Sequence, residues 1–189
     1  RSSAPSASRS VARPRMAIVP VTGVPRELAA LRPRILAALD RVLASGRVVR
    51  GPSIERFERQ WARLTGARHV VLAHSGTSAL AAALAAAGVG PRDEVVVPAL
   101  TFPGTAEAVL AVGAVPVAVD VAPDTLLLDV AAALRAVGPR TRAVVPVHLY
   151  GQVHPDLPRL ARALRRRRVA LVEDACQAHG ALYKGKKVG

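Results

Sequence analysis

Five short apolar runs without polar alternation constrain the fold of this chain more than any other feature. They lie at residues 70–73, 94–98, 115–120, 143–147 and 169–172. Stretches with helical spacing of apolar residues separate them, at 78–87, 103–112, 130–137 and 155–167. Strands that are buried on both faces have continuous apolar sequences, and helices between them connect parallel neighbours. The alternation therefore predicts an α/β fold with a largely parallel sheet and helices on both faces.

The first 66 residues have a different pattern. Residues 25–45 show helical spacing up to Gly46, and a second helix is expected after the break at Gly51, with Ser53 as its N-cap and Gly66 at its end. The stripe of this second helix is predicted to pack in the core and consists of Ile54, Phe57, Trp61 and Leu64. We therefore expect a disordered leader at 1–15, a helical segment at 16–66 and an α/β domain at 67–189.

Composition excludes several classes of protein. A hydrophobic content of 51% excludes global disorder, and no apolar stretch is long enough to span a membrane. The single cysteine, Cys176, excludes an internal disulfide and favours a cytoplasmic location. The net charge of +14 would suit a nucleic-acid-binding or regulatory protein. However, the arginines of 159–168 alternate with leucines at helical spacing, which predicts the solvent-exposed face of a helix, and only 3% of residues are aromatic.

Two adjacent carboxylates follow the last apolar run. Glu173 and Asp174 come directly after residues 169–172, and ligands of open α/β sheets gather at the carboxyl ends of strands. Asp174 could there hold a metal, an ammonium group or a protonated ring nitrogen, or it could cap the following turn. Nearby Cys176 and His179 have no second ligand pair, so we expect no metal site.

Two further strand ends carry candidate binding residues. Gly76, Thr77 and Ser78 follow the run at 70–73 and open the next helix. Their backbone N–H groups and hydroxyls could bind an anion or serve as an ordinary helix cap. Phe102 follows the run at 94–98 and could stack on a flat ligand or pack in the core.

Four segments together resemble the DegT/DnrJ-type sugar aminotransferases, which are pyridoxal-phosphate (PLP) enzymes of the aspartate-aminotransferase fold. They are H-S-G-T-S-A-L at 74–80, D-E-V-V-V-P-A-L-T-F-P-G-T at 93–105, P-V-H-L-Y-G-Q at 146–152 and E-D-A-C-Q-A-H-G-A-L-Y-K-G-K-K-V-G at 173–189. Their order and spacing also match, from about residue 51 to 189. The sequence departs from the family at His74, where Asn or Ser is common, and at Cys176, where a small residue is usual.

The resemblance implies a role for each candidate residue. Gly76, Thr77 and Ser78 would hold the cofactor phosphate at a helix N-terminus. Phe102 would stack on the pyridine ring. Asp174 would pair with the ring nitrogen and keep it protonated, and Gln177 would bond near the phenolic oxygen of the ring.

The resemblance also implies what the chain is part of. The lysine that forms the Schiff base would lie just past Gly189, so the chain would be the N-terminal part of the PLP-binding large domain and inactive alone. The full enzyme would be a homodimer that moves an amino group from an amino acid, with glutamate as the expected donor, to a keto group of a nucleotide-linked sugar. A sugar dehydratase of the same family and a basic nucleic-acid-binding or regulatory protein are the alternatives.

Overall fold

The computed structural model describes residues 23–189, and its contacts divide the chain into two units, Arg1–Gly51 and Pro52–Gly189. In the first unit, α1 (Val24–Ser45) ends at Gly46, which takes a left-handed φ of 64° and donates its N–H to the carbonyl of Leu43 at 3.0 Å. The leader expected at 1–15 lies outside the described residues. The expected division after residue 66 stays a prediction.

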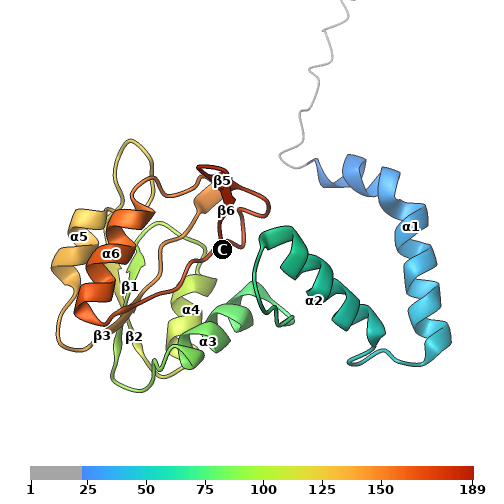
Figure 1. Ribbon diagram of the computed structural model, residues 1–189, viewed down its shortest axis with the longest axis horizontal. Coiled ribbons are helices and arrows are strands. Elements are labelled where there is room, and N and C mark those ends of the chain that lie inside the picture. The colour runs from blue at the N-terminus through green and yellow to red at the C-terminus, as the bar shows by residue number, and fades with distance from the viewer. Residues whose placement is uncertain (1–22) are drawn as a thin grey trace, which may run out of the picture. The chain divides into compact units, whose positions relative to one another are not determined.

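The second unit contains a four-stranded parallel sheet (Figure 1). The order is β2-β1-β3-β4, and the strands are β1 (Glu94–Pro98), β2 (Val115–Val119), β3 (Thr141–Val144) and β4 (Ala170–Leu171). A separate antiparallel pair, β5 (Leu182–Tyr183) and β6 (Lys186–Lys187), lies at the end of the chain. Four of the five predicted runs therefore contribute strands to one sheet.

Helices cover both faces of this sheet, as the sequence predicts (Figure 1). α3 (Gly76–Ala86) and α4 (Gly104–Ala111) enclose one core with Val95 and Val97 of β1. α5 (Val130–Ala136) and α6 (Leu157–Arg167) enclose the other core with Val96. Successive residues of β1 thus serve opposite faces, because strand side chains alternate. This is the buried parallel sheet that the continuous apolar runs indicate.

The strand predicted at residues 70–73 is wrong. This segment has no regular secondary structure and pairs with no strand in the described part of the chain, and Val71 is 86% exposed. The backbone N–H of Leu72 donates instead to the carboxylate of Glu58 in α2 at 2.8 Å. An apolar run shows that a segment suits a sheet, but pairing also requires a neighbouring strand, and none of those described lies beside it.

In the helix α2 (Pro52–Thr65), the predicted N-cap and part of the predicted core packing are wrong. The helix begins at Pro52, so Ser53 lies inside the first turn and is not the N-cap, because the fixed φ of proline suits the first helical position. Phe57 and Leu64 are 42% and 49% exposed, so core packing is wrong for them. Trp61 is partly buried, and its ring stacks on Phe57 at a centroid distance of 5.6 Å.

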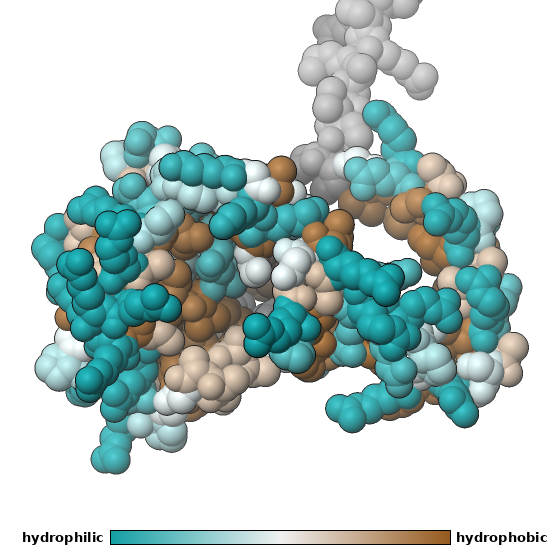
Figure 2. All heavy atoms as spheres, in the orientation of Figure 1, coloured by the Kyte–Doolittle hydropathy of each residue, from teal (hydrophilic) through white to brown (hydrophobic). Residues whose placement is uncertain are grey.

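The arginine-rich helix confirms its predicted orientation. In α6, Leu160 and Leu164 are fully buried, while the arginines between and after them are exposed. Figure 2 shows hydrophilic residues gathered over the part of the surface where α5 and α6 lie. No helix among residues 23–189 has the length and apolar character needed to cross a bilayer.

Candidate active site

A hollow of about 340 Å³ opens at the carboxyl edge of the parallel sheet. The ends of β1, β3 and β4 meet there with the N-termini of α3 and α4. Its lining comprises Ser75, Gly76, Thr77, Leu80, Thr101, Phe102, Gly104, Thr105, Val147, Asp174, Cys176 and Gln177. Segments that are distant in the sequence therefore meet in one place, because parallel strands all end at the same edge of the sheet.

Asp174 is held in the hollow by its backbone and by its side chain. Its N–H donates to the carbonyl of Pro146 at 3.0 Å, and its carbonyl accepts the N–H of His148 at 3.0 Å. These bonds continue the parallel pairing of β3 and β4 past the ends of both strands. One carboxylate oxygen accepts the N–H of Cys176 at 3.2 Å, and the other accepts the hydroxyl of Thr105 at 3.0 Å. The carboxylate thus has a fixed direction.

Two threonines form a polar chain behind this carboxylate. Thr105 is 1% exposed, and its Oγ1 lies 2.9 Å from Oγ1 of Thr101. Because the Thr105 hydroxyl donates to Asp174, the Thr101 hydroxyl is the donor in this second bond. The buried hydroxyl is therefore satisfied in both directions and presents its proton to the carboxylate.

The N-terminus of α3 faces the same hollow. Ser75 is the N-cap, and its Oγ accepts the N–H of Ser78 at 3.2 Å. The first N–H groups of a helix have no partner within it, which leaves those of Gly76 and Thr77 available to a ligand. Gly76 also approaches the strand end closely, because a Cβ at this position would lie 2.6 Å from Sγ of Cys176. Glycine is needed here for space.

Ser78 lies away from the hollow. Its Oγ lies 2.6 Å from Oγ of Ser75 and 3.3 Å from the ring nitrogens of His74, and it does not line the cavity. Its backbone N–H is occupied by the cap. The phosphate-binding role predicted for Ser78 stays a prediction, and Ser75, which the sequence interpretation leaves out, occupies the lining in its place.

Phe102 stands at the mouth of the hollow with 63% of its surface exposed. Gly104 allows this position, because a Cβ there would lie 2.8 Å from Cε1 of Phe102 and 2.5 Å from Oγ1 of Thr77. The glycine therefore brings the starts of α3 and α4 together beside the aromatic ring. An exposed ring at the rim is available to stack on a flat ligand.

Gln177 completes the lining and has one end already engaged. Its Oε1 accepts the N–H of Tyr150 at 2.8 Å, in the short 3₁₀ turn Leu149–Gly151. This bond assigns the oxygen of the amide, so the two N–H donors of the same side chain are left for a ligand.

Glu173 points to the other side of the strand end. Its Oε2 lies 3.0 Å from Nε2 of the fully buried His148. Nδ1 of His148 accepts the backbone N–H of His154 at 3.2 Å, so Nε2 carries the proton and donates to the carboxylate. This hydrogen bond holds the pKa of Glu173 below its usual value, with help from the N–H of Gly189 and against the effect of partial burial.

Cys176 lies beside Asp174 and has little thiolate character. Burial, together with hydrogen bonding to the nearby carboxylate of Asp174 and the charge of that carboxylate, raises the pKa of its thiol to about 11. Since the thiolate is the reactive form, this environment disfavours a nucleophilic role. Among the described residues no group of three or more His, Cys, Asp and Glu side chains could hold a metal ion.

Sequence interpretation anticipated five lining residues and missed others. The structure brings together Gly76, Thr77, Phe102, Asp174 and Gln177. The additional polar residues are Ser75, Thr101 and Thr105. A signal for the last two was present, because threonines four residues apart at the end of an apolar run and the start of a helix can share one side of a turn.

The DegT/DnrJ/EryC1/StrS aminotransferase family matches residues 29–189. The chain belongs to this family. A dTDP-3-amino-3,4,6-trideoxy-alpha-D-glucose transaminase of Streptomyces venezuelae is 46% identical over 84% of the chain and 42% of its own length. An L-glutamine:2-deoxy-scyllo-inosose aminotransferase of Streptoalloteichus tenebrarius is 48% identical over 82% of the chain and 38% of its own length. The chain therefore spans about two fifths of the length of these curated relatives.

Solved structures of the family have the same fold. The structure of S. venezuelae DesV, in complex with a ketimine intermediate, is similar with a TM-score of 0.87 and 43% identity over 90% of the chain and 46% of that structure. Matched structures from Bacillus subtilis and Streptococcus pneumoniae hold the cofactor in its pyridoxamine phosphate (PMP) form. The α/β sheet described above is accordingly the corresponding portion of a fold-type-I PLP aminotransferase.

Proposed function

We propose that the enzyme to which this chain belongs is a PLP-dependent aminotransferase that acts on a keto group of a sugar. The observation that carries the proposal is the hollow at the carboxyl edge of the sheet. It combines a helix N-terminus, an exposed aromatic ring and a fixed carboxylate. These are the three kinds of group that a phosphorylated, flat and cationic ring requires.

The donor set of the hollow fits PLP. The free N–H groups of Gly76 and Thr77 and the dipole of α3 favour a phosphate. Asp174 supplies a negative charge for the protonated ring nitrogen, and Phe102 supplies a face for the ring. The free amide N–H groups of Gln177 suit the phenolic oxygen. When bound, the cofactor supplies an electron sink for breaking the C–H bond of the amino donor.

The residues of the chain would bind and orient this group. Asp174 would keep the proton on the ring nitrogen, because an opposite charge within a few ångströms favours the charged form. Thr105 and the N–H of Cys176 would stop the carboxylate from rotating away, since each holds one of its oxygens. Gly76 would let the phosphate-binding turn approach the strand end.

We propose an amino acid as donor and a nucleotide-linked keto sugar as acceptor. Glutamate remains our first candidate for the donor, and glutamine is an alternative that the scyllo-inosose aminotransferase suggests by its name. The nucleotide-linked acceptor is supported by the similarity to the dTDP-sugar transaminase. We further propose a homodimer in the cytoplasm; the exposed side chains of Phe57 and Leu64 in α2 leave apolar surface for a second subunit to cover.

The test compares Asp174→Asn with Glu173→Gln in the full-length protein. Each variant removes one carboxylate charge, at adjacent positions that face opposite sides of the strand end. We expect Asp174→Asn to slow amino transfer by roughly a hundred-fold or more, as the loss of one preorganised electrostatic contact does. Glu173→Gln should slow it much less.

The measurement is the single-turnover conversion of bound PLP to PMP, followed by absorbance, with glutamate and glutamine as donors. Cofactor occupancy is measured separately after gel filtration. Near-normal transfer by the Asp174→Asn enzyme would reject the proposed role of the carboxylate. If the acceptor sugar loses water and gains no amino group, the enzyme is a dehydratase.

A further inference from the structure

A second hollow region lies at the amino ends of the parallel strands, at the opposite edge of the sheet from the candidate active site. A cavity of about 920 Å³ lies at the starts of β3 and β4, and another of about 520 Å³ lies at the starts of β1 and β2. Both are lined by Pro139 and Arg142, so they adjoin each other. We name this region the arginine groove after the six arginines that line it, Arg92, Arg135, Arg140, Arg142, Arg167 and Arg168.

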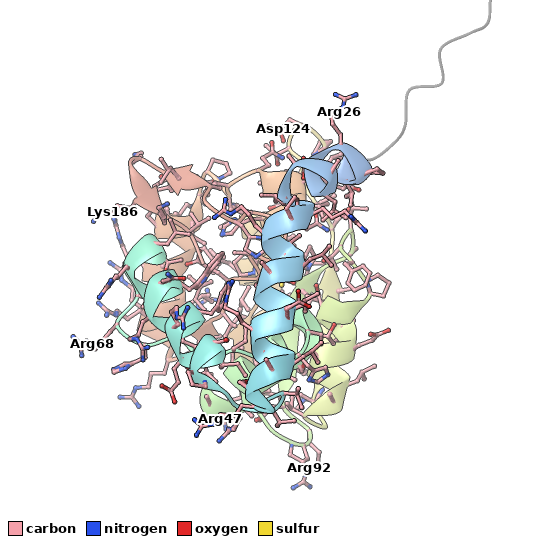
Figure 3. All side chains as sticks on the ribbon, turned by 90° about the vertical axis from the view of Figure 1, so that its right-hand side faces the viewer. Arg26, Arg47, Arg68, Arg92, Asp124 and Lys186 are labelled. Carbon is pink, nitrogen blue, oxygen red and sulfur yellow. The ribbon has the colours of Figure 1, made fainter. Side chains whose placement is uncertain are left out.

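These arginines come from segments that are distant in the sequence. Arg92 precedes β1, Arg135 lies in α5, Arg140 and Arg142 border the start of β3, and Arg167 and Arg168 end α6. Figure 3 shows Arg92 at the opposite end of the second unit, Pro52–Gly189, from Asp124, which follows β2. The groove is therefore a convergence created by the fold and is not simply the exposed face of one helix.

The charge of the groove is only partly balanced. Arg140 pairs with Glu94 at 2.6 Å and Arg142 pairs with Asp93 at 3.2 Å. Arg167 donates to the carbonyl of Leu134 at 2.7 Å, which leaves its charge uncompensated. Within residues 23–189, Arg92, Arg135 and Arg168 form no ion pair. Asp129 adds a third carboxylate that interacts with Arg135, so positive charges still outnumber negative ones in the groove.

The backbone at two of these positions is unusual for arginine. Arg92 and Arg168 have φ values of 69° and 57°, in the left-handed region that glycine and asparagine favour. Arg168 is the residue that ends α6, where glycine would be the ordinary choice. Both positions therefore hold an arginine at a conformational cost, and both arginines line the groove.

We propose that the arginine groove binds a small ligand that carries two or more adjacent phosphate groups. One guanidinium group can donate two parallel hydrogen bonds to the oxygens of one phosphate, so a groove with several arginines suits a ligand with several phosphate groups. No aromatic residue lines either cavity, so the groove offers no platform on which the bases of a nucleic-acid strand could stack. The cavity at β3 and β4 is large enough for a small molecule.

The test uses inorganic pyrophosphate and the full chain, with calorimetric titration at constant ionic strength. The groove variant is Arg135→Gln with Arg168→Gln. Its matched control is Arg162→Gln with Arg166→Gln, which removes two exposed charges from α6 that neither line the groove nor form ion pairs. We expect saturable binding that weakens about fivefold or more in the groove variant, which loses two guanidinium groups that can contact the phosphates. Binding should change little in the control, because its two arginines lie outside the groove.

Three results would overturn the proposal. The first is the absence of saturable binding, and the second is an equal loss of affinity in both double variants. The third is that a duplex DNA binds more tightly than pyrophosphate and that its binding also depends on Arg135 and Arg168. The last result would assign the groove to a nucleic-acid backbone. Circular dichroism checks that each variant is folded. If the groove variant does not fold, the single substitution Arg92→Gln, in the exposed loop before β1, is tested in its place.

Discussion

Replacing Gly76 with alanine is expected to destabilise the protein through one contact. The new Cβ would lie 2.6 Å from Sγ of Cys176 but 3.6 Å from Cβ of the same residue. The backbone of Gly76 is not in the left-handed region, so alanine is conformationally acceptable, and alanine is also the better helix former. Any loss of stability must therefore come from the sulfur atom.

The magnitude follows from the overlap. An optimal contact between heavy atoms of this kind is about 3.5–4.0 Å long, so the methyl group is about 1 Å too close to the sulfur. Overpacking of this size costs about 1–3 kcal/mol, and a rotation of the Cys176 side chain would reduce it to about 0.5–1.5 kcal/mol. We expect Gly76→Ala to lower the free energy of unfolding by about 1–2 kcal/mol.

A double-mutant cycle with Cys176→Ala isolates this contact. Without Sγ, the nearest atom is Cβ of residue 176 at an ordinary distance, so the cost of Gly76→Ala should vanish in that background. Urea unfolding followed by circular dichroism measures all four proteins. Gly138→Ala is the matched control, because a Cβ there meets nothing within 4 Å and the φ of Gly138 is also not left-handed. The reasoning is refuted if Gly76→Ala is as harmless as Gly138→Ala, or if its cost persists without the sulfur.

Three further outcomes follow from other contacts. The pKa of Glu173 is lowered from 4.5 in the folded state, so its ionised form stabilises the fold above about pH 4.5, and this stabilisation is lost as the pH falls through the folded pKa. In an acid titration followed by circular dichroism, the stability of Glu173→Gln should therefore fall less steeply with decreasing pH than that of the unmodified protein. Because the pKa of the Cys176 thiol is raised to about 11, alkylation by iodoacetamide at pH 8 should be much slower than that of a free thiol, and Asp174→Asn should accelerate it. Leu160→Ala should lower the free energy of unfolding by about 2–5 kcal/mol, as measured by urea unfolding, because its side chain is fully buried; a loss below 1 kcal/mol would contradict the assigned core.

The strands and helices after residue 93 were predictable from local patterns. Val95, Val96 and Val97 form a continuous apolar run because each face of β1 is covered by a different helix pair. The parts that failed depend on partners. Val71 and Phe57 are apolar, but the described residues offer no strand for the first and no core for the second. The spacing of apolar residues indicates which side chains are suited to burial, whereas actual burial depends on which elements pack beside them.

Residues of the candidate site were predictable only where their type and their position at the end of a strand or helix indicate a binding role. Asp174 follows an apolar run, and Gly76 precedes a helix, so strand and helix ends identify both. The spacing of Thr101 and Thr105 indicates that the two can share one side of a turn, but it indicates no distant partner for Thr105. Its hydrogen bond to Asp174 spans 69 positions of sequence and depends on the order β1-β3-β4 in the sheet. Sheet order is a global property that local spacing does not encode.

The end of β4 assigns opposite tasks to two adjacent carboxylates. Asp174 faces the hollow and is held by Thr105, whereas Glu173 faces the buried His148. His148 in turn accepts the N–H of His154, whose Nε2 donates to the carbonyl of Leu128 at 2.7 Å. This chain of hydrogen bonds ties the segment after β3 to the strand end from behind, and the backbone of His148 also bonds to the carbonyl of Asp174. The rigidity of Asp174 therefore arises from both sides of the strand. The charge that faces the hollow can stay fixed because the neighbouring Glu173 is hydrogen-bonded to the buried His148.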